Sequence, residues 1–334
     1  MQIKAILECG GYTLDLISPP ERPHRWELAL SGIKLGLANG FYRPAGLASL
    51  RAGGSQRSLL KALYHRFPDI KGFIFEGTGF GALAGLGWCK RHGLKTVLIP
   101  ANIESLANYP GAWTHKNLSV SERFRNEEPW LRLADAIFAI SIEEAWWLEL
   151  HGIKAQHLPY HPCEQHLESL VRLRQAREPD HNFGYLLLAD FGNAANLRGA
   201  RVFAELLAKG LTVNHPIHVV GRGMEQAEHI FESHSSHPFI FEGECTELAL
   251  AEFQRRCLAL VLFHPPTSGM LTRVVDAAIA NIPIVGNLMG LKSYYHFFSE
   301  ALIEAEHFPL QPSVRLSPEP SRQAEASLLR TLEA

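Results

Sequence analysis

Short apolar runs alternate with longer amphipathic stretches along this chain, and this alternation constrains its fold more than any other feature. Residues 72–75, 96–99 and 136–140 are apolar runs that predict buried strands, and 82–92 predicts a helix between the first two. Ser141-Ile142-Glu143-Glu144 is a capping-box pattern that predicts a helix start directly after the third strand. Strands that alternate with helices form a parallel sheet with helices on both faces.

The alternation stops at residues 159–181, which hold three prolines and a charged helical stretch, and we interpret this segment as the region between two domains. It then resumes, with strands expected at 185–189, 218–220, 239–241, 258–263 and 284–285 and helices at 199–209, 247–256 and 271–280. Two similar halves predict two facing Rossmann-like domains with a central cleft. We expect these at 1–165 and 180–310, followed by a C-terminal tail at 311–334.

Composition excludes several classes of protein. The net charge of the 334 residues is -2, so no basic field is present to hold nucleic acid. The five cysteines are odd in number and form no Cys-x-x-Cys pair, which favours reduced thiols and a cytoplasmic location. No apolar run is long enough for a transmembrane helix, although a peripheral membrane contact stays open.

Residues 265–286 are the most informative segment. They follow an apolar run, and their pattern predicts a loop, then a helix, then a strand. Backbone N–H groups of a small-residue loop at a helix N-terminus bind anions well. Arg273 suits phosphate oxygens in a forked geometry, and Asp276 lies on the same helix face, where it would accept hydrogen bonds from ribose hydroxyls. A surface ion pair between these two residues is the alternative. The candidate donor-binding residues here are Ser268, Gly269, Met270, Leu271, Arg273 and Asp276.

This segment resembles the donor-site motif of retaining glycosyltransferases of the family-4 kind, which have the GT-B fold. Ser268-Gly269 matches the Ser-Gly of that motif. Arg273 stands where the family has Lys, and Asp276 where it has the ribose-binding Glu. Residues 281–285 match the Pro-Val-Val strand that follows.

Further matches occur in the same order as in the family and cover most of residues 70–295. Residues 190–196 resemble the glycine-containing loop of the donor domain, and 219–223 resemble its Val-Gly-x-Gly strand end. Residues 241–243 resemble a later Phe-x-Gly turn, and 134–141 resemble the strand that ends in Ser. The resemblance therefore adds these candidate donor-binding residues: Gly192, Asn193, Arg198, Gly221 and Arg222.

The first half carries a competing motif. Residues 77–82 satisfy G-x-G-x-x-A, the dinucleotide fingerprint of a dehydrogenase, but the nearest acidic residue, Glu104, follows Pro100 and is expected in a loop. Residues 100–105 resemble the family's His-Asn-x-Glu-Ser loop, with Ala101 in place of His; helix capping is the alternative role. The candidate acceptor-side residues are Glu76, Gly77, Thr78, Gly79 and Ser105, and Asn102 and Glu104 are candidate catalytic residues.

No metal site is expected, because His161, Cys163 and His166 lack a second cluster at zinc spacing. The resemblance implies a metal-independent, hexosyltransferase-type enzyme without a cofactor, which transfers a sugar from a nucleotide-diphosphate-sugar with retention. Arg273 would stabilise the leaving diphosphate, and the acceptor, whether saccharide, lipid-linked or protein, is not readable. The alternatives are an inactive GT-B-like nucleotide-binding or scaffold protein and an NAD-dependent dehydrogenase.

Overall fold

The computed structural model describes residues 47–107, 118–232, 239–265, 269–291, 302–304, 326–328 and 330–331. The chain forms two compact units. The first consists of Met1–Tyr160, Ser268–Met270 and Glu319–Ala334, and the second of His161–Thr267 and Leu271–Pro318. Ser268 and most of the expected tail at 311–334 lie outside the described residues.

The first unit is built on a parallel sheet whose strands follow one another in the order β1-β2-β3-β4. Its strands are β1 (Gly72–Glu76), β2 (Lys95–Ile99), β3 (Ala136–Ala139) and β4 (Gln156–His157). Its helices are α3 (Leu47–Arg66), α4 (Phe80–Arg91), α5 (Val120–Leu131) and α6 (Ile142–Leu150). The predicted helix start after Ser141 is confirmed, because the Ser141 side chain accepts a hydrogen bond from the N–H of Glu144 at the start of α6. The Glu144 side chain, which a capping box would turn back to Ser141, accepts from the N–H of Ile103.

One part of the first unit's core comes from the far end of the chain. Leu328 is fully buried and packs with Val97, Ile99, Phe138 and Leu158. Next to it, the Ser327 hydroxyl donates to Oε1 of Gln156 over 2.7 Å. Residues 326–328 therefore pack in the unit that begins the chain.

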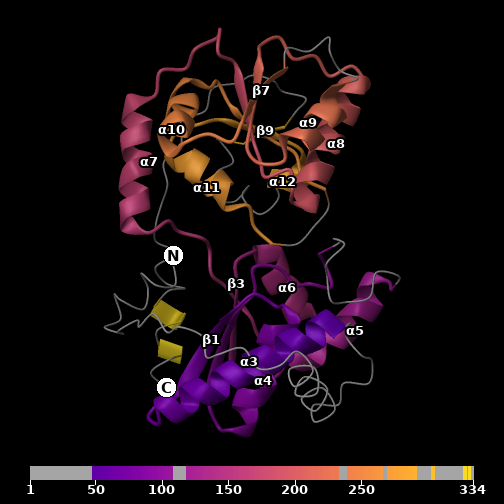
Figure 1. Ribbon diagram of the computed structural model, residues 1–334, viewed down its shortest axis with the longest axis vertical. Coiled ribbons are helices and arrows are strands. Elements are labelled where there is room, and N and C mark those ends of the chain that lie inside the picture. Colours follow the sequence, from indigo (N-terminus) through magenta and orange to yellow (C-terminus); the bar gives the residue numbers. More distant parts are fainter. Residues whose placement is uncertain are drawn as a thin grey trace. The chain divides into compact units, whose positions relative to one another are not determined.

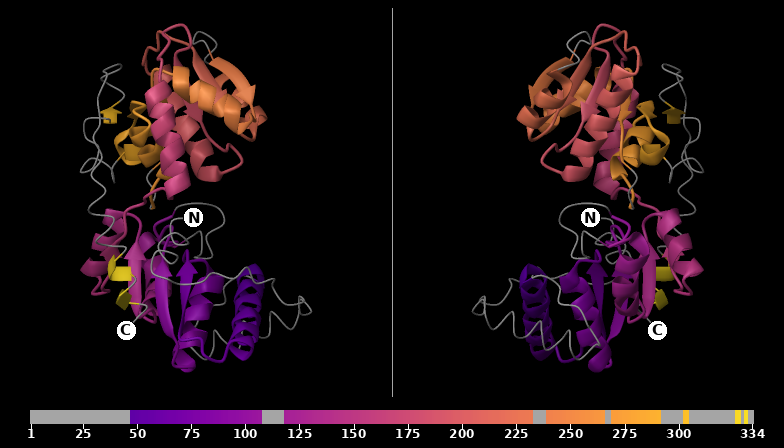
Figure 2. Two further views of the ribbon diagram at one scale, coloured as in Figure 1. Left: turned by 90° about the vertical axis from the view of Figure 1, so that its left-hand side faces the viewer. Right: turned by 90° about the vertical axis from the view of Figure 1, so that its right-hand side faces the viewer.

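The second unit has a six-stranded parallel sheet in the order β10-β9-β8-β5-β6-β7. Its strands are β5 (Tyr185–Leu188), β6 (Ile217–Val220), β7 (Phe239–Gly243), β8 (Leu260–Leu262), β9 (Ile284–Gly286) and β10 (Leu302–Glu304). Its helices are α7 (Glu164–Ala176), α8 (Ala194–Ala208), α9 (Met224–Phe231), α10 (Glu247–Arg256), α11 (Thr272–Ile279) and α12 (Leu288–Leu291). Helices α8 and α9 lie on one face of the sheet and α10 and α11 on the other (Figures 1 and 2).

The strand order places a topological switch point between β5 and β8. From β5 the chain proceeds outward to β6 and β7, then returns to the other side of β5 and continues through β8 and β9. In open α/β sheets, ligands bind outside the carboxyl ends of the strands at such a point. The turns after β5 and β8 are therefore the first place to look for a site in this unit.

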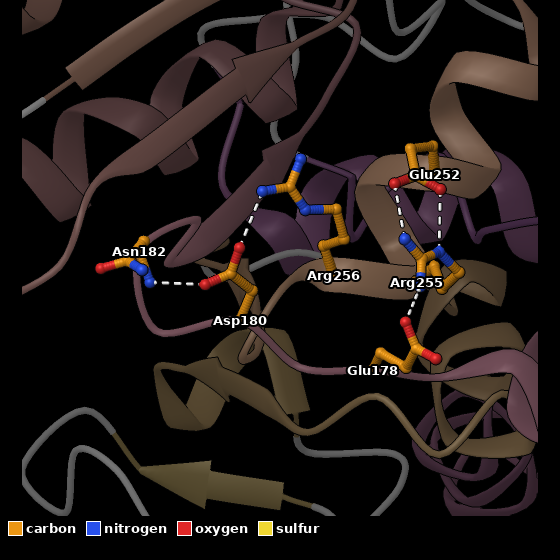
Figure 3. Close-up of polar contacts among 6 residues, drawn as sticks. All are labelled: Glu178, Asp180, Asn182, Glu252, Arg255 and Arg256. Carbon is orange, nitrogen blue, oxygen red and sulfur yellow. Dashed lines mark hydrogen bonds and ion pairs between the residues drawn. The ribbon is translucent and has the colours of Figure 1, made fainter.

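The segment expected to be a linker is instead part of the second unit. Helix α7 packs against α10 and α11, and its own Leu170 is buried. The chain that follows α7 is tied to the end of α10 (Figure 3). Arg256 forms an ion pair with Asp180 over 2.7 Å, and Arg255 pairs with Glu178 and Glu252.

The described cysteines, Cys89, Cys163, Cys245 and Cys257, are free thiols. Within the described ranges, no helix combines the length and the apolar character needed to cross a membrane.

Candidate functional site

The turn after β5 prepares a helix N-terminus at the switch point. Oδ1 of Asp190 accepts a hydrogen bond from the N–H of Gly192 over 3.0 Å, which closes the turn. Asn193 then caps α8 by accepting from the N–H of Ala195 over 2.8 Å. Gly192 and Asn193 are both exposed there. This end of α8 carries the positive side of the helix dipole, which favours a bound anion.

The turn after β6 is locked against the turn after β5. Arg222 forms an ion pair with Asp190, and its carbonyl accepts from the N–H of Phe191 over 2.8 Å. Gly221 has a φ of 138°, and a Cβ there would lie 1.8 Å from the Ala189 carbonyl oxygen, so only glycine fits. The two turns therefore form one rigid edge.

Arg273 joins α11 to this edge. Its NH1 donates to the carbonyl of Leu188, the last residue of β5, over 2.9 Å, and its NH2 donates to Oδ1 of Asn196 over 3.0 Å. Asn196 in turn donates to the carbonyl of Asp190 over 3.0 Å. A helix that follows β8 thus places a guanidinium at the carboxyl end of β5, close to the N-terminus of α8.

Asp276 contacts another element. Its Oδ2 lies 3.2 Å from Nε2 of His166 in α7. Arg198 is half-buried in the second turn of α8. The loop residues Gly269 and Met270 group with the first unit, whereas Leu271, at the N-cap of α11, groups with the second.

The turns after β1 and β2 come together in the first unit. The buried Thr78 hydroxyl donates to the carbonyl of Asn102 over 2.6 Å, and the Gly77 N–H donates to the carbonyl of Ile99 over 2.8 Å. Glu76 and Gly79 are exposed in the same region. Nδ2 of Asn102 lies 3.5 Å from Oε1 of Glu104, the outer limit of a hydrogen bond.

Two buried carboxylates that were not among the predicted site residues fix the turn after β2. Glu127 of α5 accepts hydrogen bonds from the backbone N–H groups of Glu104 and Ser105, and Glu144 of α6 accepts from that of Ile103. Burial raises the pKa of Glu127 to about 7, while its hydrogen bonds with Ser105 and Glu104 lower it. Ser105 is fully buried, so it anchors the turn from inside.

The dehydrogenase fingerprint is incomplete in the structure. Strand β2 ends at Ile99, and Glu104 lies beyond it in the turn, where its backbone is bound to Glu127. The acidic residue that should meet a ribose at the strand end is therefore out of place. Among the residues that the structure describes, no three His, Cys, Asp or Glu side chains gather as a metal site requires.

No protein-family model matches the chain, and no curated protein matches its sequence. Solved structures do match. A UDP-forming α,α-trehalose-phosphate synthase from Burkholderia xenovorans has a TM-score of 0.53 and 10% identity, covering 89% of this chain and 78% of that chain. An α,α-trehalose 6-phosphate synthase from Burkholderia multivorans has the same TM-score and identity, covering 92% and 77%. The fold is GT-B.

A third solved structure is that of TarM, with a TM-score of 0.49 and 10% identity, covering 84% of this chain and 51% of that chain. This chain thus spans about half the length of TarM. At these identities the likeness concerns the fold alone: two Rossmann-like α/β units with parallel sheets.

Proposed function

We propose that this protein is a glycosyltransferase that moves a sugar from a nucleotide-diphosphate-sugar to an acceptor, with retention and without a metal or other cofactor. The GT-B fold supports this class, and the motif resemblance supports the donor. The donor nucleotide occupies the carboxyl edge of the second sheet, at the turns after β5, β6 and β8.

The position of Arg273 is the observation that carries the proposal. Its bonds to Leu188 and Asn196 hold a permanent positive charge at the switch point, next to the capped N-terminus of α8. Guanidinium and helix N-terminus together form a site for a diphosphate. Because negative charge grows on the diphosphate as the sugar leaves, such fixed donors stabilise the transition state more than the substrate.

Asp276 binds the ribose in this proposal. A carboxylate has about four acceptor positions on two oxygens, so one oxygen can meet His166 while the other accepts from ribose hydroxyls. The two residues therefore have separable roles, since ribose is unchanged by the reaction whereas the diphosphate gains charge.

Calorimetric titration with UDP, GDP and ADP tests the site, followed by donor turnover with the matching nucleotide-sugars. We expect Asp276→Ala to weaken nucleotide affinity by about 1.5–3 kcal/mol. Arg273→Ala should lower kcat by about 10²–10³, because the positive donor that meets the growing charge is lost. The exposed pair Arg172→Ala and Glu168→Ala on α7 gives matched controls, and both should behave as wild type. Wild-type nucleotide affinity in Asp276→Ala would refute the proposed donor site.

A noncatalytic nucleotide-binding protein is the second candidate, because Ala101 stands where the resembling family has His. That candidate predicts nucleotide binding with neither sugar transfer nor donor hydrolysis. Turnover of any nucleotide-sugar by the wild-type chain excludes it.

A further inference from the structure

Three consecutive backbone N–H groups of one turn are held by two buried carboxylates. Ile103 donates to Oε1 of Glu144 over 2.6 Å. Glu104 donates to Oε1 of Glu127 over 3.0 Å, and Ser105 donates to Oε2 of Glu127 over 2.8 Å. Glu127 thus uses both of its oxygens, one for each N–H. The carboxylates come from α5 and α6, so two helices fix a turn that follows β2.

This arrangement leaves the turn little freedom. Besides the three N–H groups, the carbonyl of Asn102 accepts from the Thr78 hydroxyl, and the Ile103 side chain is fully buried in the core. The side chains of Asn102 and Glu104, our candidate catalytic residues, are mounted on this fixed backbone; that of Asn102 is half-buried, whereas that of Glu104 is buried.

We propose that Glu127 is a positioning residue, whose carboxylate holds the 102–105 turn in the conformation that presents Asn102 to the acceptor substrate. The inference rests on the proposed function in one respect, namely that the acceptor meets this turn. Glu127 itself does not touch substrate, because its side chain is fully buried.

Stability alone does not account for an ionisable group at this place. A buried carboxylate is costly, and a well-packed apolar residue of similar volume often stabilises a fold as well or better. What the carboxylate adds is the capacity to accept two N–H bonds at once. When the carboxyl is protonated, one of its oxygens becomes a donor, so one of the two N–H groups loses its partner. Protonation of Glu127 therefore loosens the turn.

Several titratable or charged groups lie on the elements around Glu127. Glu104 in the turn is the charged neighbour that raises the pKa of Glu127, in addition to burial, which is the larger cause. The groups on the surrounding elements are Arg123 on α5, Glu144 and His151 at α6, and Cys89, Lys90, Arg91 and His92 at α4. Because the two N–H bonds lower the pKa of Glu127, ionisation favours the turn in which they are made over one in which Glu127 stays buried without them, so the turn becomes more fixed as the pH rises around 7. The buried charge still lowers the stability of the folded unit as a whole, because burial raises the pKa by more than the bonds lower it.

Hydrogen exchange on the full chain tests the structural half of the proposal. In Glu127→Gln, which keeps the size but replaces one acceptor by a donor, the amides of Glu104 and Ser105 should lose about 10- to 100-fold in protection. In wild type their protection should rise with pH around 7, and Glu127→Asp should keep that pH dependence. Glu128→Gln, the next residue on α5 with a surface partner in Arg132, is the matched control and should exchange as wild type. Unchanged protection in Glu127→Gln would overturn the proposal. If Glu127→Gln fails to fold, the wild type still decides: protection of the Glu104 and Ser105 amides that does not change with pH would overturn the proposal.

Kinetics test the functional half. Glu127→Gln should lower kcat by about 10- to 100-fold, as misplaced groups do. Affinity for the nucleotide that the titrations select should be unchanged, because Arg273, Asp276 and the start of α8 lie in the second unit. A lost protection with an unchanged kcat would overturn the positioning role. If wild type turns over no nucleotide-sugar, the proposed function fails, whereas the exchange experiment still decides whether Glu127 fixes the turn.

Discussion

A single methyl group added at Gly199 should disturb the proposed donor site at the carboxyl edge of the second sheet. Gly199 is buried in α8, and a Cβ there would lie 2.1 Å from the carbonyl oxygen of Phe263 and 2.9 Å from its carbonyl carbon. Ordinary contact begins at 3.4 Å, so the methyl group is about 1.3 Å too close to the oxygen. The obstacle is the backbone just beyond β8, which cannot rotate away as a side chain could. In Gly199→Ala, α8 must move outward.

Two opposing terms set the magnitude. Overpacking of this kind costs about 1–3 kcal/mol. The upper end applies here, because the methyl group on α8 meets backbone atoms of Phe263, which cannot rotate away. Alanine favours a helix over glycine by about 1 kcal/mol, which offsets part of that cost. We expect a net loss of about 1–2 kcal/mol in the stability of the second unit. We also expect weaker nucleotide binding, because Gly192 and Asn193 move with the start of α8.

The distribution of tryptophan provides the assay. All six tryptophans lie between residues 26 and 147, within the first unit. Intrinsic fluorescence therefore follows unfolding of the first unit, while circular dichroism follows both. In Gly199→Ala the fluorescence transition should stay in place and part of the dichroism transition should move to lower denaturant. Gly79→Ala is the control, since a Cβ there meets nothing within 4 Å. A wild-type dichroism transition together with wild-type nucleotide affinity would refute the reasoning.

Three further predictions concern the core, the pH dependence and metals. Leu328→Ala should destabilise the first unit by about 2–5 kcal/mol, seen as an earlier fluorescence transition; an unmoved transition would contradict its burial. Because the pKa of Glu127 is raised from 4.5 to about 7 in the folded chain, the free energy of unfolding should fall by about 3 kcal/mol as pH rises from 4.5 to 7. Glu127→Gln should flatten this dependence in denaturant titrations at several pH values. Transferase activity should survive EDTA, and a strict need for manganese or magnesium would count against the proposed mechanism.

Much of the fold could be predicted from local patterns, and the errors have local causes. The apolar run at 218–220 became β6, and Ser141 caps the start of α6 as expected. Helix α8 starts at Ala194, five residues before the predicted start, because Asn193 was not recognised as its cap. Prolines and charges suggested a linker at 159–181, although Leu170 gives the helix there an apolar side to bury.

The site was less accessible from sequence because strand order determines it. Arg273 and Leu188 are 85 residues apart, and they meet only because the chain returns to place β8 beside β5. No local pattern carries that information. Glu127 is different, since Phe124 and Leu131 lie three residues before it and four after it. That spacing puts the Glu127 carboxylate on the apolar face of α5. A charged group on an apolar face indicates a buried side chain with hydrogen-bond partners in the fold.

The burial of Leu328 also determines when the first unit can finish folding. Proteins are made from the N-terminus, so residue 328 leaves the ribosome only after the whole of the second unit. Until then the position beside Val97 and Phe138 is unfilled, and the first sheet exposes apolar surface while the second unit is already being assembled. A nascent or truncated chain that stops before residue 319 would therefore carry its defect in the first sheet, where the exposed apolar surface is a binding site for a chaperone or a protease.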